Sequence, residues 1–308
     1  MLQHLCFFVS DLYRIKDSLV GMKIGICTAG SANMKIYLLF IFIISFLATN
    51  ANANVIGNDF LSADTGVRAL AMGSAYTAVA NDSNSIFYNA AGLGEIKSAA
   101  LLTSYGNVFG MASKTHASLV VPVGGGAIGI GYIGLKVRDI VRTDDAGTVQ
   151  GSFSYGDTAY LLGYGLNTGV DWLSLGIVGK YLVKECNGNV KRGLGIDISS
   201  LIITDIMNIG ISIHDINKTA IGNDVYSSRI RAGMAIKPMK NVIVSTDYYE
   251  GSMSYGAEVS VIQEVSFQVG YVNDMVTMGC GLSVDSIKIN VAYSKHDLGD
   301  SLKAEIGF

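Results

Sequence analysis

The sequence predicts an all-β protein: a transmembrane antiparallel β-barrel of about fourteen strands. Three observations lead to this prediction. From Lys97 to Phe308, apolar and polar residues alternate in segments roughly ten residues long. The connections between these segments alternate between short and long. The last segment ends on an aromatic residue, Phe308, at the end of the sequence.

The alternation is clearest in the segments 173–183, 206–213, 287–294 and 301–308. In the last of these, one set of alternating residues is Leu302, Ala304, Ile306 and Phe308, and the other is Ser301, Lys303, Glu305 and Gly307. Successive side chains of a strand point to opposite faces, so each segment has one apolar and one polar face. A soluble β-sandwich would give the same alternation with its apolar face turned inward.

The lengths of the connections favour the barrel over the sandwich. Outer-membrane barrels have an even number of strands, short periplasmic turns and longer external loops. A sandwich has no reason to keep such a rhythm along the whole chain. We expect short turns at 122–125, 166–169, 203–205, 238–240, 263–264 and 285–286. We expect mostly longer connections between them, at 137–151, 185–190, 217–226 and 250–252, followed by brief ones at 273–274 and 295–300.

The amino-terminal region has the parts of a secretory signal peptide at residues 34–53. Lys35 supplies the charge, residues 36–47 the apolar stretch, and Ala51-Asn52-Ala53 the small-residue cleavage pattern, with cleavage expected near Ala53. The apolar run is shorter than the roughly 20 residues of a spanning helix, which disfavours a membrane anchor. We interpret residues 1–33 as an upstream start-site extension, and the start remains open between Met1, Met22 and Met34.

Composition argues against several other functions. The net charge of −3 lacks the basic excess that nucleic-acid binding requires. The histidines and cysteines after the signal have no metal-ligand spacing, so we expect no metal and no cofactor. Residues 129–134 read G-x-G-x-x-G, but they lie within a strand pattern with no helix after them. These glycines are better explained by close packing of a plug segment, described below, against a barrel strand than by dinucleotide binding. No catalytic motif occurs, and we do not expect an enzyme.

Residues 66–96 differ in composition from the barrel and carry four short motifs: GVRA at 66–69, MGSAY at 72–76, AVAND at 78–82 and YNAAGL at 88–93. These motifs resemble the amino-terminal signature of the FadL-like and PorV/PorQ-like outer-membrane proteins. The resemblance implies that residues 54–96 form a plug or hatch inside a fourteen-stranded barrel at 97–308. The residues of the plug motif are Arg68, Asp82, Asn89, Ala90, Ala91 and Gly92.

Three of these residues carry specific expectations. Ala90 stands where the resembled family usually has proline, and losing the fixed φ of proline makes the local turn less rigid. We interpret Arg68 as a tether to a carboxylate of the wall, because an unpaired interior charge is costly. The alternative is a ligand-binding arginine. Asp82 is expected to cap a helix or to form an Asx turn into residues 84–91.

Projection of the strands places a set of charged residues on the inner face of the barrel. Charges are tolerated there, whereas a charge on the lipid face costs a few kcal/mol at mid-depth. We interpret them as ion pairs that fix plug and wall, and the alternative is a lining for a substrate path. They are Lys180, Asp197, His214, Arg229, Arg231 and Glu258, together with Lys288, Lys303 and Glu305.

The resemblance to FadL-like proteins implies passage of small hydrophobic molecules across the outer membrane of a Gram-negative-type bacterium. The alternative is a PorV-like accessory protein of a secretion system, which holds exported proteins at the cell surface. A third interpretation is a structural or adhesive surface protein. The expected partners are outer-membrane lipid, a hydrophobic ligand or secreted proteins, and the outer-membrane assembly machinery. The last strand, ending at Phe308, resembles the signal that this machinery reads.

Overall fold

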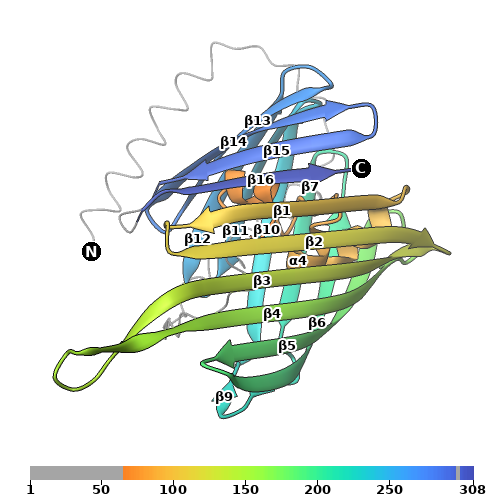
Figure 1. Cartoon of the computed structure of the whole chain (residues 1–308). Coiled ribbons are helices and arrows are strands. Elements are labelled where there is room, and N and C mark those ends of the chain that lie inside the picture. The colour runs from red at the N-terminus through yellow and green to blue at the C-terminus, as the bar shows by residue number, and fades with distance from the viewer. Residues whose placement is uncertain (1–64, 296–298) are drawn as a thin grey trace, which may run out of the picture. The chain divides into compact units, whose positions relative to one another are not determined.

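The computed structural model describes residues 65–295 and 299–308, and their fold is a closed antiparallel barrel of fourteen strands, as predicted (Figure 1). Each strand pairs with its neighbour along the chain, and β1 pairs with β16 to close the wall. The wall strands are β1 (Ala100–Val108), β2 (Ala112–Val123), β3 (Gly126–Thr143), β4 (Val149–Asn167), β5 (Leu173–Cys186), β6 (Asn189–Ile203), β7 (Met207–His214), β10 (Arg229–Met239), β11 (Val242–Tyr249), β12 (Ser252–Ser260), β13 (Val265–Val272), β14 (Met275–Val284), β15 (Ile287–Ser294) and β16 (Ser301–Gly307).

The predicted alternation sorts side chains between the bore and the outer surface. In β16, Lys303 and Glu305 are buried in the bore, whereas Leu302 and Ile306 are exposed on the outside. The same alternation along the other strands leaves a largely apolar outer surface, while polar and charged side chains face inward. In the described ranges 65–295 and 299–308, no helix is both long enough and apolar enough to cross a bilayer.

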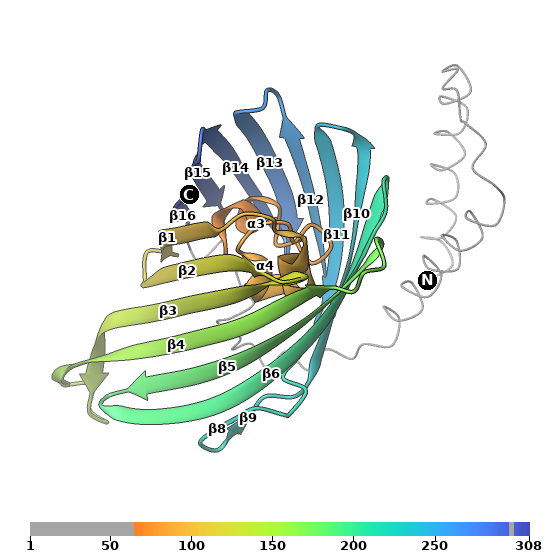
Figure 2. The same cartoon turned by 90° about the vertical axis from the view of Figure 1, so that its right-hand side faces the viewer.

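The connections expected at 137–151 and 185–190 are shorter than predicted, whereas the one expected at 217–226 is long and spans residues 215–228. We call the end where β1 begins and β16 ends the near end, and the opposite end the far end. At the far end only residues 144–148 connect β3 to β4, and only 187–188 connect β5 to β6. Most of the expected loop 137–151 is instead strand, and β3 to β6 reach beyond β1 and β2 (Figure 2).

This error has a physical reason. Val137, Ile140 and Val141 on β3 continue the ladder opposite Tyr155, Phe153 and Ser152 on β4, across one register shift. Arg138, Asp139 and Arg142 in this stretch are exposed, and a strand end outside the apolar layer accommodates charge because its side chains are in water.

The connection 215–228 also departs from the expected external loop at 217–226. It holds a small hairpin of β8 (Ala220–Ile221) and β9 (Asp224–Val225). Ile221 is fully buried, and a Cβ added at Gly193 on the inner face of β6 would lie 2.5 Å from the Ala220 carbonyl oxygen. The connection therefore folds back against the inside of the wall.

Residues 65–96, which we call the inner segment, lie inside the barrel (Figures 1 and 2). They form α3 (Val67–Ala71), α4 (Ser85–Tyr88) and the 3-10 helix η1 (Ala90–Glu95). The expected plug boundary at residue 54, the signal peptide at 34–53 and the extension at 1–33 lie outside the described residues.

Glycines of the wall let the backbone of the inner segment approach closely. A Cβ added at Gly270 would lie 1.9 Å from the Gly73 nitrogen, and one at Gly176 would lie 2.3 Å from the Ala91 nitrogen. Of the G-x-G-x-x-G run, Gly129 and Gly131 face side chains of the inner segment. Gly134 lies on the outer face instead. The two backbones are too close at these wall glycines for a side chain to fit between them, so the glycines set the position of the inner segment in the bore.

Candidate functional site

The first attachment of the inner segment to the wall is the ion pair between Arg68 on α3 and Glu258 on β12. Nε and Nη2 of Arg68 each donate to one oxygen of Glu258 at 2.7 Å, a bidentate arrangement. Nη1 donates to Asn81 at 2.7 Å and Tyr76 at 2.8 Å, and lies 3.2 Å from Asp82. Arg68 thus joins two parts of the inner segment to one carboxylate of the wall.

Asp82 organises the turn beside this pair. Its Oδ2 accepts a hydrogen bond from the Tyr76 hydroxyl at 2.6 Å, and its Oδ1 accepts one from the backbone N–H of Asn84 at 2.9 Å. The second bond is the Asx turn, whereas the helix-cap alternative is wrong because Asn84 holds the cap position of α4. Burial raises the pKa of the Tyr76 phenol well above its ordinary value, so the phenol keeps the proton that it donates.

The second attachment is Asp247 on β11. Its Oδ2 accepts from the backbone N–H groups of Tyr76 at 3.1 Å and Thr77 at 3.0 Å, and from the Thr77 hydroxyl at 2.5 Å. Arg231 on β10 lies 3.3 Å from the same oxygen and donates to the Ser74 carbonyl. Its guanidinium is also 4.7 Å from the centre of the Tyr88 ring. This site therefore binds the backbone of the inner segment directly.

The third attachment is Glu305 on β16, which accepts from the Val67 N–H at 3.3 Å and from Asn84 Nδ2 at 3.1 Å. It also lies 3.1 Å from His116 Nε2, and the other nitrogen of that ring is hydrogen-bonded to Ser104. The order Ser–His–acid is that of a hydrolytic triad. However, all three side chains are buried, and Ser104 lines neither of the two cavities described below. The arrangement is accounted for by support of the inner segment.

Asn89 connects the sequence YNAAGL to the wall. Its Nδ2 donates to the carbonyl oxygens of Thr77 and Ser200, at 2.9 and 3.0 Å, and its Oδ1 accepts from the Ala91 N–H at 3.1 Å. Ala90 is the first residue of η1. A Cβ at Gly92 would lie 2.0 Å from the Ala80 carbonyl oxygen, so only glycine fits there.

Four of the charged residues predicted to face the bore meet in one cluster at the far end. Lys180 lies 2.7 Å from Asp197 and 2.9 Å from Asp215. Arg229 lies 2.8 Å from Asp215, and His214 lies 3.0 Å from Asp197. This far-end cluster fixes the start of the inward-folded connection 215–228.

The remaining predicted charges lie elsewhere in the bore. Arg231 and Glu258 contact the inner segment, Lys303 is buried, and Lys288 lies exposed at the near end. Sequence reasoning left Asp247 out of the site, although it stands at an inward position of β11 two residues after the buried Ser245. In the described ranges, no group of three or more His, Cys, Asp and Glu residues is placed to hold a metal ion.

Apolar packing also joins the inner segment to the wall, and the buried clusters include Val178 on β5, Ala235 on β10 and Ala292 on β15. Ile86, Phe87 and Leu93 belong to the same buried cluster as Ile133 on β3 and Leu161 on β4. The carboxylates of Asp247, Glu258 and Glu305 are on β11, β12 and β16, and further polar contacts of the inner segment are made by Ser118 on β2 and Ser199 on β6.

A cavity of about 370 Å³ opens at the near end, next to the Arg68 attachment. Arg68, Asp82 and Glu258 line it together with Lys288 and Phe308. The backbone of Phe308 pairs with Leu101, and its ring is exposed on the outside.

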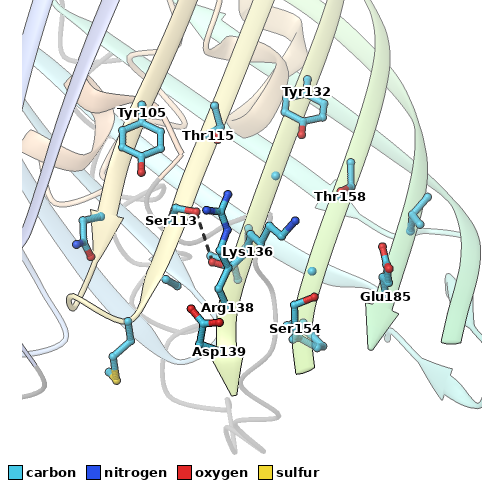
Figure 3. Close-up of a pocket in the computed structure, with 18 of the residues that line it drawn as sticks. Tyr105, Ser113, Thr115, Tyr132, Lys136, Arg138, Asp139, Ser154, Thr158 and Glu185 are labelled. Carbon is cyan, nitrogen blue, oxygen red and sulfur yellow. Dashed lines mark hydrogen bonds between the residues drawn. The ribbon is translucent and has the colours of Figure 1, made fainter. Parts of the chain in front are cut away.

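A larger cavity of about 660 Å³ lies on the outer face of β1 to β5, toward the far end (Figure 3). We call it the outer groove. The pairing of neighbouring strands arranges its lining residues in rows that run across the outer face. One row is Tyr105, Thr115, Gly134, Thr158 and Val183, and the next is Asn107, Ser113, Lys136, Gly156 and Glu185. No motif in the sequence indicated this groove, because it depends on register between five strands.

Comparison with known proteins finds structures of similar fold but no match in sequence. No family model matches the sequence, and no curated protein matches it. Among solved structures, the toluene transporter TodX of Pseudomonas putida superposes with a TM-score of 0.60 at 11% identity, covering 79% of this chain and 96% of that one. The monoaromatic hydrocarbon channel CymD gives 0.62 at 11% identity, covering 81% and 97%. A FadL homologue of Pseudomonas aeruginosa gives 0.55 at 10% identity, covering 79% and 97%.

These likenesses confirm the expected FadL-like barrel fold. The first is described as a transporter and the second as a channel, the third is described only as a FadL homologue, and none of the three is described as a PorV/PorQ-like protein. At such low identity the comparison concerns the fold alone.

Proposed function

We propose that the chain is an outer-membrane channel that passes small hydrophobic molecules, with the inner segment acting as its plug. The observation that carries this proposal is a closed fourteen-stranded barrel whose bore holds a separate segment on a few wall contacts. The toluene transporter TodX and the hydrocarbon channel CymD have the same fold.

The wall supports placement in a membrane. A closed barrel pairs every strand with two neighbours, which is one of only two ways to satisfy backbone groups in lipid. Its outer face exposes apolar side chains such as Ile130, Leu162 and Ile177, and a row of Tyr132, Tyr160 and Tyr181 lies toward the far end. Aromatic girdles of this kind mark the interface of barrel proteins with headgroups. The longest connection between described wall strands, 215–228, is at the far end, so we place the near end in the periplasm.

The bore supports a hydrophobic cargo. Ile86, Phe87 and Leu93 of the inner segment cover apolar side chains of β3 and β4. When the segment moves, this sector of the wall is uncovered and offers a surface to an apolar solute. The carboxylates of Glu258, Asp247 and Glu305 favour the seated state, because each loses charge-assisted hydrogen bonds if the segment leaves.

The alternative, a PorV-like accessory protein, calls for a broad capture platform outside the membrane. The far-end connections at 187–188, 250–251 and 273–274 have two residues each, and 215–228 folds inward. These short connections favour the channel over the accessory protein.

Uptake in a strain lacking the gene tests the proposal. Radiolabelled toluene and a fluorescent fatty acid should enter more slowly than in the parent strain, and the gene on a plasmid should restore the rate. Unchanged uptake of both solutes, with loss of secreted proteins from the cell surface, would reject the channel in favour of the accessory protein.

A further inference from the structure

The outer groove lies immediately beyond the tyrosine row of the outer face. Tyr132 pairs with Tyr160, and Tyr160 pairs with Tyr181. The ring centres are 5.6 and 6.3 Å apart, so the three rings form one continuous band. On β3, the next outer-face position after Tyr132 toward the far end is Gly134, which lines the groove. In a membrane whose apolar layer ends at the tyrosines, the groove lies at the level of the lipid headgroups.

The shape of the groove follows from the small residues in its middle. Gly156 leaves its floor open, the Tyr132 hydroxyl lies over Gly134, and larger side chains such as Tyr105 and Glu185 stand at its edges. The hydroxyl groups of Thr115, Ser154 and Thr158 line it (Figure 3). The result is a polar depression of about 660 Å³ that opens outward from the wall, away from the bore.

Two cations occupy the middle of this depression. Lys136 and Arg138 lie between Ser113 and Thr158 in Figure 3. Two acidic residues also line the groove: Glu185 on β5 lies at one edge, and Asp139 lies toward the strand tips (Figure 3). Across the described part of the chain, no carboxylate lies within ion-pair distance of Lys136 or Arg138. Both cations are therefore available to an anion from outside the chain.

We propose that the outer groove binds the phosphate-bearing headgroup of a lipid in the external leaflet. This inference rests on the membrane placement in the proposed function. Lys136 and Arg138 would bind the phosphate, hydroxyl groups would complete its hydrogen bonds, and acyl chains would run down over the tyrosine row. The lipid is favoured over a free anion because the apolar surface of Ile130 and Leu162 continues directly below the groove.

Binding of purified full-length chain to three probes in detergent tests this site by native mass spectrometry. The probes are diphosphoryl lipid A, the same lipid without phosphates, and inorganic phosphate. The test variant carries Lys136→Gln and Arg138→Gln. The matched control carries Lys237→Gln and Lys240→Gln, which are exposed at the near end. A circular dichroism melt of each variant verifies that the barrel is folded.

We expect the diphosphoryl lipid to bind at least tenfold more tightly than the dephosphorylated lipid. The test variant should lose roughly ten- to thirtyfold in affinity, the effect of two cations near a membrane surface, and the control should stay within about twofold. Equal binding of both lipids, or an equal loss in test and control variants, would overturn the site. Inorganic phosphate competing as well as the lipid would show a free-anion site and would equally overturn the proposal.

Solute uptake by the same two variants separates this inference from the proposed function. Lys136 and Arg138 lie outside the bore, so uptake should be unchanged when lipid binding is lost. Failure of lipid binding in a chain that still transports rejects only the groove. Lipid binding by a chain that passes no solute rejects only the channel.

Discussion

Arg68 illustrates what a single residue contributes and how far sequence can predict it. An interior arginine requires a carboxylate, and that requirement was predictable from the charge alone. Its partner, Glu258, is 190 positions away, so only strand order and register bring the two together. The partner of Asp82 was easier to predict, because an Asx turn needs only the N–H two residues later.

Replacement of Glu258 by Gln should loosen the inner segment. The substitution removes the bidentate carboxylate and leaves Arg68 with Asp82 as its charged partner, and breaking a buried pair on one side costs about 3–5 kcal/mol. Limited proteolysis of the folded chain should cut the inner segment faster. The control is Glu264→Gln, which lines the same near-end cavity. Equal cleavage rates in the two variants would show that the pair does not hold the segment.

Ala90 gives a second test, since it lies where the resembled family has proline. It is the first residue of η1, where an N–H has no partner within the helix, and Asn89 before it is extended. Ala90→Pro should therefore be tolerated or should stabilise the fold by up to about 1 kcal/mol. Ala91→Pro should destabilise it, because the Ala91 N–H donates to Asn89 and Ser199. Thermal melts in detergent compare the two, and similar losses in both would contradict this account.

The strands and helices show where pattern reasoning succeeds and where it does not. Alternation gave the wall strands, because each has one face toward the bore and one toward the outside. Val137 and Val141 continue the ladder between β3 and β4, so the connection expected at 137–151 is wrong over most of its length. The inner segment had no clear periodicity, and its short helices depend on contacts with the wall rather than on their own propensity.

Gly92 tests the packing of η1 against the rest of the inner segment. A methyl group at this position would meet the Ala80 carbonyl oxygen at 2.0 Å, so η1 has to shift. We expect Gly92→Ala to destabilise the protein by about 1–3 kcal/mol, the usual cost of overpacking. Gly179→Ala is the matched control, since the nearest atom there is 3.9 Å away. Thermal melts should separate the two variants, and equal melting temperatures would contradict the close approach.

In the whole molecule, the barrel wall surrounds an inner segment that is attached to several of its strands. The strand count and the inside–outside alternation were predictable from the sequence. The carboxylates that hold the inner segment were not all predictable. Their positions depend on which strands close the barrel and on the register that sets Glu258, Asp247 and Glu305 against one short segment.

The proposed channel opens when the inner segment moves, and a reversible cross-link tests whether this movement is required. Ser83 of the inner segment and Ser118 of β2 are buried, with their hydroxyl oxygens 2.9 Å apart. Ser83→Cys with Ser118→Cys, in a background of Cys186→Ser and Cys280→Ser, places two thiols where a disulfide can form. The two single-cysteine variants are the controls.

The decisive measurement is the rate of toluene uptake by cells carrying this pair, before and after reduction with dithiothreitol. The proposal predicts that the oxidised chain passes no toluene, that reduction restores the rate, and that the single-cysteine variants do not respond. Uptake at the same rate in the oxidised and reduced states would contradict a channel that opens by moving its inner segment.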